Sequence, residues 1–378
     1  MKENWQIYKQ LFSEIDYKWW TLLAVSIGLF TSVFDHNSMN VALPSIADHF
    51  FTDLPTTQWI LVGYGLTIAA LLLPMGRLSD LLGRKKVYLF GFVIFTIAGF
   101  VAASSGNIFQ LIGAKLVQGS GAAMTQGTSM AMVLSAFGER DRGKALGLTM
   151  SVVGIGAVVG PAIGGFLVDY LGWQSVLYCT SGLGAFSIII GAVILDSSLS
   201  GGGEHKGDDF DWLGAVLSSF ALVALLLGMT AGSRIGWMSP AVMIALFSFI
   251  VTLSAFVWWE LRVSSPMLDI RLFRIKLFFT GATAGWLSFL GTQPVRFLMP
   301  FYLQFVLGYS PATIGWIIVP SAFCMVLVGP LSGRLSDRYG WRIFNVGGLM
   351  VAAVGLLILC NIDINSPLAL VMVGMIIQ

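Results

Sequence analysis

Long apolar runs separated by short polar segments fill most of the chain. A helix that crosses the hydrocarbon core of a bilayer needs about twenty mostly apolar residues. Runs of this kind predict membrane-spanning helices near residues 20–46, 57–75, 87–105, 108–136, 145–167, 175–195, 212–231, 240–260, 277–307, 312–332, 343–361 and 367–378. The last run still continues at Gln378, so we expect eleven complete spans, a partial twelfth and a sequence that is a fragment.

The composition excludes several classes of protein. Of the 378 residues, 56% are apolar and 11% are charged, whereas soluble domains have roughly 25% charged residues. The mean hydropathy is +0.84. These values exclude a cytosolic enzyme, a secreted disulfide scaffold and a nucleic-acid-binding protein, and they place the chain in a lipid bilayer. Cys179, Cys324 and Cys360 lie in apolar runs without the spacing of metal ligands, so we expect neither a metal nor a cofactor.

The basic residues predict the orientation. If the N-terminus and every second loop lie in the cytoplasm, that side holds 18 of the 21 Lys and Arg residues. The outer loops hold Arg234, and Lys115 and Arg296 fall inside predicted spans. Cytoplasmic loops are rich in Lys and Arg. We therefore predict a multi-pass protein of the cell (inner) membrane with its N-terminus in the cytoplasm; the first eighteen residues have mixed charges and lack the pattern of a cleaved signal.

An internal repeat predicts the domain organisation. The pentapeptide GRLSD occurs at residues 76–80 and again at 333–337, an offset of 257, and each copy follows a span and opens a cytoplasmic loop. The polar stretch LDSSLSGGGEHKGDDFD reads as a linker. We predict a six-helix bundle at 1–195, a linker with two inserted spans at 196–276, and an incomplete second bundle at 277–378. Parallel repeats of six helices are the architecture of major facilitator transporters.

Several motifs resemble one family. GRLSDLLGRKKV resembles the loop signature of the major facilitator superfamily, and FDHNSMNVALPSI, KLVQGSGAAM, GIGAVVGPAIGGFLVDYLGW and PFYLQFVLGYSPATIGW are similar to signatures of its fourteen-helix drug:proton antiporters. The resemblance implies an all-α membrane protein of the major facilitator fold that exports hydrophobic or cationic small molecules in exchange for protons by alternating access. It implies a monomer with no catalytic residue. The main departure is Lys115, where the family usually has arginine.

Two opposite charges inside predicted spans are the candidates for proton coupling. Asp35 lies roughly 16 Å from the outer end of the first span, and Lys115 lies roughly 10 Å from the outer end of the fourth. Intramembrane ionisable groups are functional candidates by default, so we expect the two side chains to pair. Gln118 lies one turn beyond Lys115 on the same helix face. The alternatives are an Asp35 exposed to water at the end of a shorter span and a Lys115 that extends toward the interface.

The repeated loop motif predicts a cytoplasmic gate. Gly76 permits close helix approach, and Asp80 and Arg84 have the i, i+4 spacing of an ion pair. By resemblance these residues and Gly83 form a charge cluster with Arg140 or Arg142, and the second copy contributes Asp337, Arg338 and Arg342. The alternative is ordinary positive-inside topology, which leaves Gly76, Asp80 and Gly83 unexplained.

The glycines of the fifth span predict helix packing. Their spacing imitates a nucleotide-binding loop, but they lie in an apolar span with no strand before them. Glycines three or four residues apart let another helix approach closely in lipid. We assign this role to Gly154, Gly156, Gly160, Pro161, Gly164 and Gly165, and we expect Pro161 to bend the helix.

Aromatic and amide side chains on the same spans are candidates for a substrate cavity: Trp59, Tyr64, Gln126, Trp286, Arg296, Tyr302 and Gln304. The same residue types also form belts at the membrane interface, and Arg296 could equally extend outward. Two other functions stay open. One is transport of another solute, such as an amino acid, a siderophore or a self-made antibiotic; the other is a truncated, non-transporting membrane protein.

Overall fold

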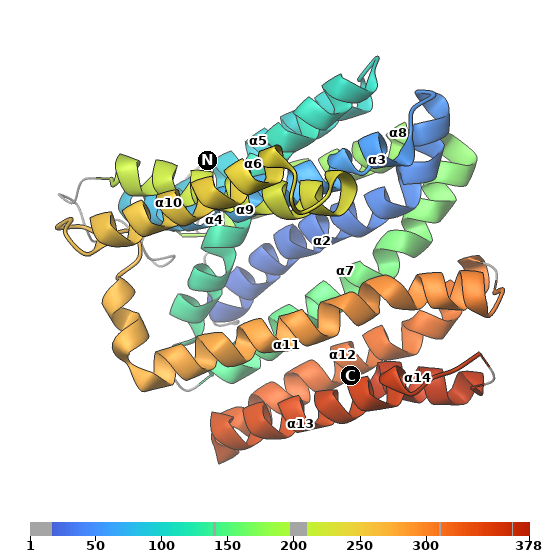
Figure 1. Ribbon diagram of the computed structural model, residues 1–378. Coiled ribbons are helices and arrows are strands. Elements are labelled where there is room, and N and C mark those ends of the chain that lie inside the picture. The colour runs from blue at the N-terminus through green and yellow to red at the C-terminus, as the bar shows by residue number, and fades with distance from the viewer. Residues whose placement is uncertain (1–16, 139–140, 197–209, 310, 365) are drawn as a thin grey trace, which may run out of the picture. The chain divides into compact units, whose positions relative to one another are not determined.

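The computed structural model describes residues 17–138, 141–196, 210–309, 311–364 and 366–378, and within these residues it is all helical (Figure 1). This confirms the predicted all-α fold class for the described residues. The helices are α2 (Tyr17–His49), α3 (Leu54–Thr57), α4 (Trp59–Leu82), α5 (Arg84–Ala103), α6 (Ile108–Phe137), α7 (Arg142–Leu171), α8 (Gln174–Ile194), α9 (Trp212–Ile235), α10 (Pro240–Glu260), η1 (Ile270–Arg274), α11 (Lys276–Phe301), η2 (Tyr302–Val306), α12 (Pro311–Tyr339), α13 (Trp341–Cys360) and α14 (Leu368–Ile377).

Hydropathy separates two kinds of long helix. In the described part of the chain, eight helices are long and apolar enough to cross a membrane, among them α4, α5, α7 and α8. The long helices α2, α6 and α11 are not in this group, and of these α2 and α6 carry the buried charges Asp35 and Lys115. Polar side chains within membrane spans face the protein interior because lipid offers them no partner. The polar composition of α2 and α6 therefore marks them as interior helices.

The chain forms two compact units, which are described separately. Unit 1 contains residues 1–136 and 163–271, and unit 2 contains residues 137–162 and 272–378. The division falls within α7, one residue beyond Pro161, although α7 is assigned as one continuous helix through that proline. The predicted symmetric bundles at 1–195 and 277–378 stay a prediction.

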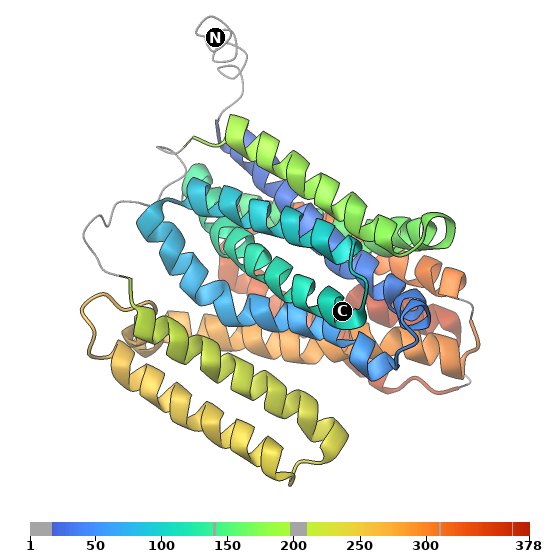
Figure 2. The same ribbon diagram turned by 90° about the horizontal axis from the view of Figure 1, so that it is seen from above.

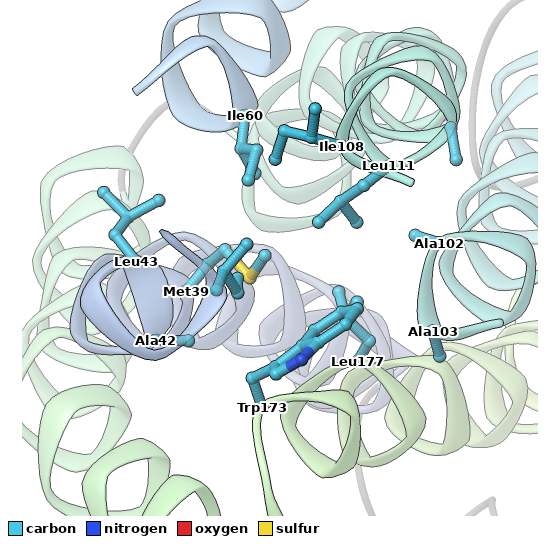
Figure 3. Close-up of a cluster of buried hydrophobic side chains, with 12 residues drawn as sticks. Met39, Ala42, Leu43, Ile60, Ala102, Ala103, Ile108, Leu111, Trp173 and Leu177 are labelled. Atoms are coloured by element: carbon cyan, nitrogen blue, oxygen red, sulfur yellow. The ribbon is translucent and has the colours of Figure 1, made fainter. Parts of the chain in front are cut away.

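The interior of unit 1 is held by close backbone contacts and a cluster of apolar side chains. A Cβ added at Gly91 of α5 would lie 2.8 Å from the carbonyl oxygen of Gly121 on α6, so the two backbones touch. Lipid tails are as apolar as these side chains, and close packing therefore replaces the hydrophobic effect as the main source of cohesion. Figure 3 shows the cluster, to which α2 contributes Met39 and α6 contributes Leu111. Trp173, directly before α8, packs in the same cluster.

Polar contacts show which helix ends of unit 1 lie together. At one end, Lys85 at the start of α5 donates through Nζ to the carbonyl of Leu195, just after α8. At another, Arg234 near the end of α9 donates to the carbonyl of Pro55 in α3, at 3.0 Å. Successive loops alternate between the two ends, as antiparallel neighbouring helices require. The side of the membrane on which each end lies stays a prediction.

Helices α9 and α10 form a hairpin in unit 1, called the inserted hairpin after the sequence prediction, and they lie side by side (Figure 2). The carboxylate of Asp211 caps the start of α9 by accepting from the backbone N–H of Gly214 at 2.8 Å. Helix α9 packs on α4, where Ser219 Oγ donates to the carbonyl of Ala70 at 2.8 Å. The hairpin is therefore attached to unit 1 through the helix that carries the first GRLSD copy.

The sequence repeat extends to the helix ends. Helix α5 runs from Arg84 to Ala103 and α13 runs from Trp341 to Cys360, so both ends keep the offset of 257. The residue between α4 and α5 is Gly83, with φ +99°, and the residue between α12 and α13 is Gly340, with φ +93°. Side chains rarely adopt such angles, so each turn of the repeat requires its glycine.

Candidate functional site

A buried ion pair joins α2 to α6 in unit 1. Lys115 Nζ lies 3.1 Å from Asp35 Oδ1 and 3.0 Å from Oδ2, so the ammonium bridges both oxygens. Each side chain is only 1% exposed. Breaking a buried pair by removing one partner costs about 3–5 kcal/mol, because the other charge is left uncompensated. The sequence prediction that these two groups approach each other matches this geometry, and the alternative of a water-exposed Asp35 does not.

Aromatic rings cover the ion pair on the side of α4. The ring centroid of Tyr64 lies 5.3 Å from Lys115 Nζ, a distance at which the ring face attracts a cation. The His36 ring stacks on the same tyrosine, with centroids 6.3 Å apart. Tyr64, which the sequence predicts as a cavity residue, lies beside the ion pair, and only 2% of its surface is exposed.

Gln118 lies on α6 close to the ion pair but makes no hydrogen bond with it. The side chain is buried, and neither amide atom has a hydrogen-bond partner. Its amide nitrogen lies toward α5, where a Cβ added at Gly99 would be 3.1 Å away. The structure thus brings together Asp35 and Lys115 and leaves Gln118 as a neighbour on the next turn.

Gly76, Arg77 and Asp80 of the first gate motif line part of an open pocket of about 530 Å³ in unit 1. Arg84 donates from Nε and Nη2 to Oδ1 of Asp80, at 3.1 and 3.0 Å, and from Nη1 to the carbonyl of Ala131 at 3.3 Å. The pair therefore fixes the end of α4 against α6. The cavity is lined by Ala69, Leu72, Leu73, Gly76, Arg77, Asp80, Gln126, Gly127 and Met267. Of the predicted cavity residues, Gln126 lines this space.

The second gate motif has a different partner. Asp337 accepts from the backbone N–H groups of Gly143 and Lys144 at the start of α7, each at 2.9 Å. A carboxylate at a helix N-terminus satisfies unpaired N–H groups and interacts favourably with the helix dipole. Arg338 lies over the ring of Tyr339, with its guanidinium carbon 5.4 Å from the centroid. Arg142 and Arg342 also belong to unit 2, and Arg140 lies outside the described residues.

Glycine contacts between α7 and α12 in unit 2 were missing from the sequence predictions. A Cβ added at Gly329 would lie 2.9 Å from the carbonyl oxygen of Gly147, and the backbones of Gly333 and Gly143 are closer still. Ser151 Oγ donates to the carbonyl of Val326 at 3.0 Å on the same helix face. The signal was available, because both helices place two glycines four residues apart, the spacing typical of close helix packing.

The predicted packing glycines on α7 have mixed surroundings. Gly154, Gly156, Gly160 and Gly164 are buried, whereas Gly165 is half-buried and Pro161 is exposed. In unit 1, a Cβ added at Gly164 would lie 2.8 Å from Cα of Ser38 on α2, so α7 directly contacts the helix that carries Asp35. Gly165 is looser, since its nearest neighbour, Val41, would be 3.8 Å from an added Cβ.

The other predicted cavity residues belong to different units or lie outside the described side chains. Trp59 is half-buried at the start of α4, Trp286 on α11 is 64% exposed, and the Tyr302 hydroxyl donates to the carbonyl of Asp363 at 3.0 Å. The side chains of Arg296 and Gln304 lie outside the described part of the structure. Trp59 belongs to unit 1, whereas Trp286 and Tyr302 belong to unit 2, so the shared substrate cavity stays a prediction.

Comparison with known proteins finds relatives over most of the chain. The chain is 33% identical over 356 residues to the multidrug resistance protein Stp of Mycobacterium tuberculosis, a match that covers 94% of this chain and 65% of Stp. It is 29% identical over 360 residues to the riboflavin transporter RibZ of Clostridioides difficile, covering 95% of this chain and 77% of RibZ. The chain thus spans about two thirds of the length of Stp.

Solved structures share the fold. A proton:xylose symporter, XylE, matches with a TM-score of 0.63 at 13% identity, covering 96% of this chain and 78% of that chain. The human organic anion transporter MFSD10 matches with a TM-score of 0.59 at 16% identity, covering 95% and 82%. Residues 25–378 match the Major Facilitator Superfamily. The chain therefore belongs to this superfamily of membrane transporters.

Proposed function

We propose that the protein exports hydrophobic or cationic small molecules in exchange for protons. The observation that carries this proposal is the buried Asp35–Lys115 pair, since an ion pair in the interior of a membrane protein is costly and marks a functional site. Its position between α2 and α6, the polar interior helices, supports a role in transport. Several relatives are named for multidrug or lincomycin resistance, which supports a drug-like substrate.

The chemistry we propose is the transfer of one proton at Asp35. Protonation neutralises the carboxylate and leaves Lys115 without its counter-ion inside the protein, a state that favours rearrangement of α2 relative to α6. A cationic substrate and a proton compete for the same carboxylate. Exchange follows because one carboxylate does not hold two positive ligands. No bond other than O–H forms or breaks.

Gating and packing motifs complete the proposal. The Asp80–Arg84 pair and the contact of Asp337 with the start of α7 would stabilise a closed cytoplasmic end. The glycine faces of α7 would let this helix move against its neighbours with little steric cost. The distribution of basic residues supports an N-terminus in the cytoplasm and location in the inner membrane.

Transport of another solute is the second candidate. It is favoured by the similarity to the riboflavin transporter RibZ, and relatives named for tetracenomycin C and actinorhodin extend the range to antibiotics made by the cell. All of these solutes fit alternating access on the same fold. A binding screen that includes riboflavin and lipophilic cations separates the candidates.

Substitution of the ion pair tests proton coupling. We expect Asp35→Asn, which mimics the protonated carboxyl, to abolish proton-driven export and substrate-induced proton release while the protein stays folded and inserted. Lys115→Arg restores the residue usual in the family and should retain transport. Lys115→Ala should move the pH dependence of transport to higher pH, because the cation no longer favours ionised Asp35.

The measurement is proton release and substrate efflux in proteoliposomes. The protein used for it should include any helices that follow residue 378 in the gene. Asp53→Asn, at an exposed carboxylate in the segment between α2 and α3, is the matched control and should leave coupling unchanged. Wild-type proton coupling in Asp35→Asn would overturn the proposal.

A further inference from the structure

Apart from the Asp35–Lys115 ion pair, two buried carboxylates lie where the inserted hairpin meets α4. Asp211 precedes α9 and is 7% exposed, and Glu260 ends α10 and is 4% exposed. Both approach the same space beside Gly214: a Cβ added there would be 3.0 Å from Glu260 Oε1 and in closer contact with Asp211 Oδ2. One oxygen of each carboxylate therefore approaches the same point beside Gly214.

The hydrogen bonds around the pair leave one oxygen without a donor. Asp211 Oδ1 accepts from Gly214 N and from Trp259 Nε1, each at 2.8 Å. Glu260 accepts from the backbone N–H groups of Met267 and Leu268, each at a long 3.3 Å. Asp211 Oδ2 is fully buried and has no hydrogen-bond partner. A buried carboxylate oxygen without a donor is costly, and here it faces a second carboxyl group.

The charges near the pair do not balance. Arg77 of α4 lies within electrostatic range of Glu260, as does Asp211, so two carboxylates face one guanidinium. Glu260 also occupies the last residue of α10, where the helix dipole disfavours a negative charge. One added positive charge would neutralise the group. The described residues hold no set of three or more His, Cys, Asp or Glu side chains that suits a metal ion.

We propose that Asp211 and Glu260 share one proton, which makes them a second proton-binding site separate from the Asp35–Lys115 pair. Glu260 carries the proton on Oε1 and donates it to Asp211 Oδ2, while Asp211 stays ionised as the cap of α9. The shared proton locks the N-terminus of α9 to the C-terminus of α10. It also holds the segment after α10, through Met267, at the cavity beside Gly76, Arg77 and Asp80.

Loss of the shared proton reverses these effects. Two ionised carboxylates then repel each other in a buried space, and the hairpin loosens from α4 and the first gate motif. The inserted hairpin thereby responds to cytoplasmic pH at the end of the molecule where the gate motif lies. This role concerns the hairpin and does not depend on how Asp35 functions.

The test is the thermal stability of the purified, full-length protein as a function of pH, in an Asp35→Asn background that removes the proposed coupling site. We expect Glu260→Gln, whose amide N–H can donate to Asp211 Oδ2 permanently, to raise the unfolding midpoint by several degrees at alkaline pH. The difference should vanish at acidic pH, where the wild-type pair holds its proton. The sign follows because the group releases its proton as pH rises and then destabilises the folded state.

A matched control and a direct probe complete the test. Asp269→Asn changes an exposed carboxylate of the same connecting segment and should show no pH-dependent difference. The infrared band of a protonated carboxylic acid should be present at neutral pH and absent in Glu260→Gln. The proposal is overturned if that band persists in Glu260→Gln. It is also overturned if Glu260→Gln destabilises the protein at every pH. A third contrary outcome is that Na⁺ or Mg²⁺ alone stabilises the protein that keeps Glu260 at alkaline pH, which would make the site a metal-ion site.

Discussion

At the scale of single residues, the contribution of the Asp35–Lys115 ion pair to stability can be tested separately from its proposed role in transport. Lys115→Met removes the partner of Asp35 and leaves a buried carboxylate, so we expect a loss of about 3–5 kcal/mol in unfolding free energy at neutral pH. The double variant Asp35→Asn/Lys115→Met removes both charges and should recover most of this loss, because replacement of a whole buried pair is often nearly neutral. Denaturant or thermal unfolding in detergent measures both. Additive effects of the two substitutions would contradict a direct interaction.

The contact between Asp35 and Lys115 could be predicted from the sequence, because the depth of each residue in the membrane can be counted from the end of its apolar run and the two depths are similar. The Asp211–Glu260 pair could not be predicted in this way. Asp211 ends a polar linker and Glu260 ends a span, so each reads as an ordinary interfacial charge, and only the packing of α9 on α10 brings them together. The environment of Gln118 likewise depends on how the helices pack, because its amide nitrogen lies toward α5 and not toward the Asp35–Lys115 pair.

At the scale of helices, the turns of the repeat give a test of backbone geometry. Gly83 has φ +99°, and an added side chain there is strained, although no atom lies within 4 Å of its Cβ position. We expect Gly83→Ala to cost about 1–2 kcal/mol in stability and Gly340→Ala to cost a similar amount. Gly65→Ala, at an open position inside α4, should be neutral or slightly stabilising, because Ala favours helix. Equal effects at Gly83 and Gly65 would contradict the assigned role of the turn.

The packing of α7 on α12 gives a second test at this scale. A Cβ at Gly333 would collide with the carbonyl of Gly143, so Gly333→Ala should destabilise unit 2 by about 1–3 kcal/mol through overpacking. Gly347→Ala on α13 is the control, because nothing lies within 4 Å of its Cβ position. Thermal unfolding in detergent compares the two. A Gly333→Ala protein as stable as Gly347→Ala would show that the two backbones do not approach.

At the scale of the whole molecule, apolar runs predicted every long helix of the described residues. The helix lengths were less predictable. Helix α2 extends to His49 and α4 to Leu82, beyond the apolar runs that ended at 46 and 75. Hydropathy indicates only the apolar part of a helix, whereas contacts with other helices and helix caps allow the helix to extend beyond it. The division into units within α7 also depends on packing, which no run of apolar residues records.

The proposed orientation makes a prediction about the whole chain in its membrane. Asp53 and Lys86 are both exposed, but they lie in segments that the alternation of loops assigns to opposite sides. In a background with Cys179, Cys324 and Cys360 replaced by Ser, a membrane-impermeant thiol reagent added to intact cells should label Asp53→Cys. It should label Lys86→Cys only after the membrane is permeabilised, because the basic loops remain in the cytoplasm. Labelling of Lys86→Cys in intact cells, with Asp53→Cys protected, would invert the topology and would place the first gate motif on the outside.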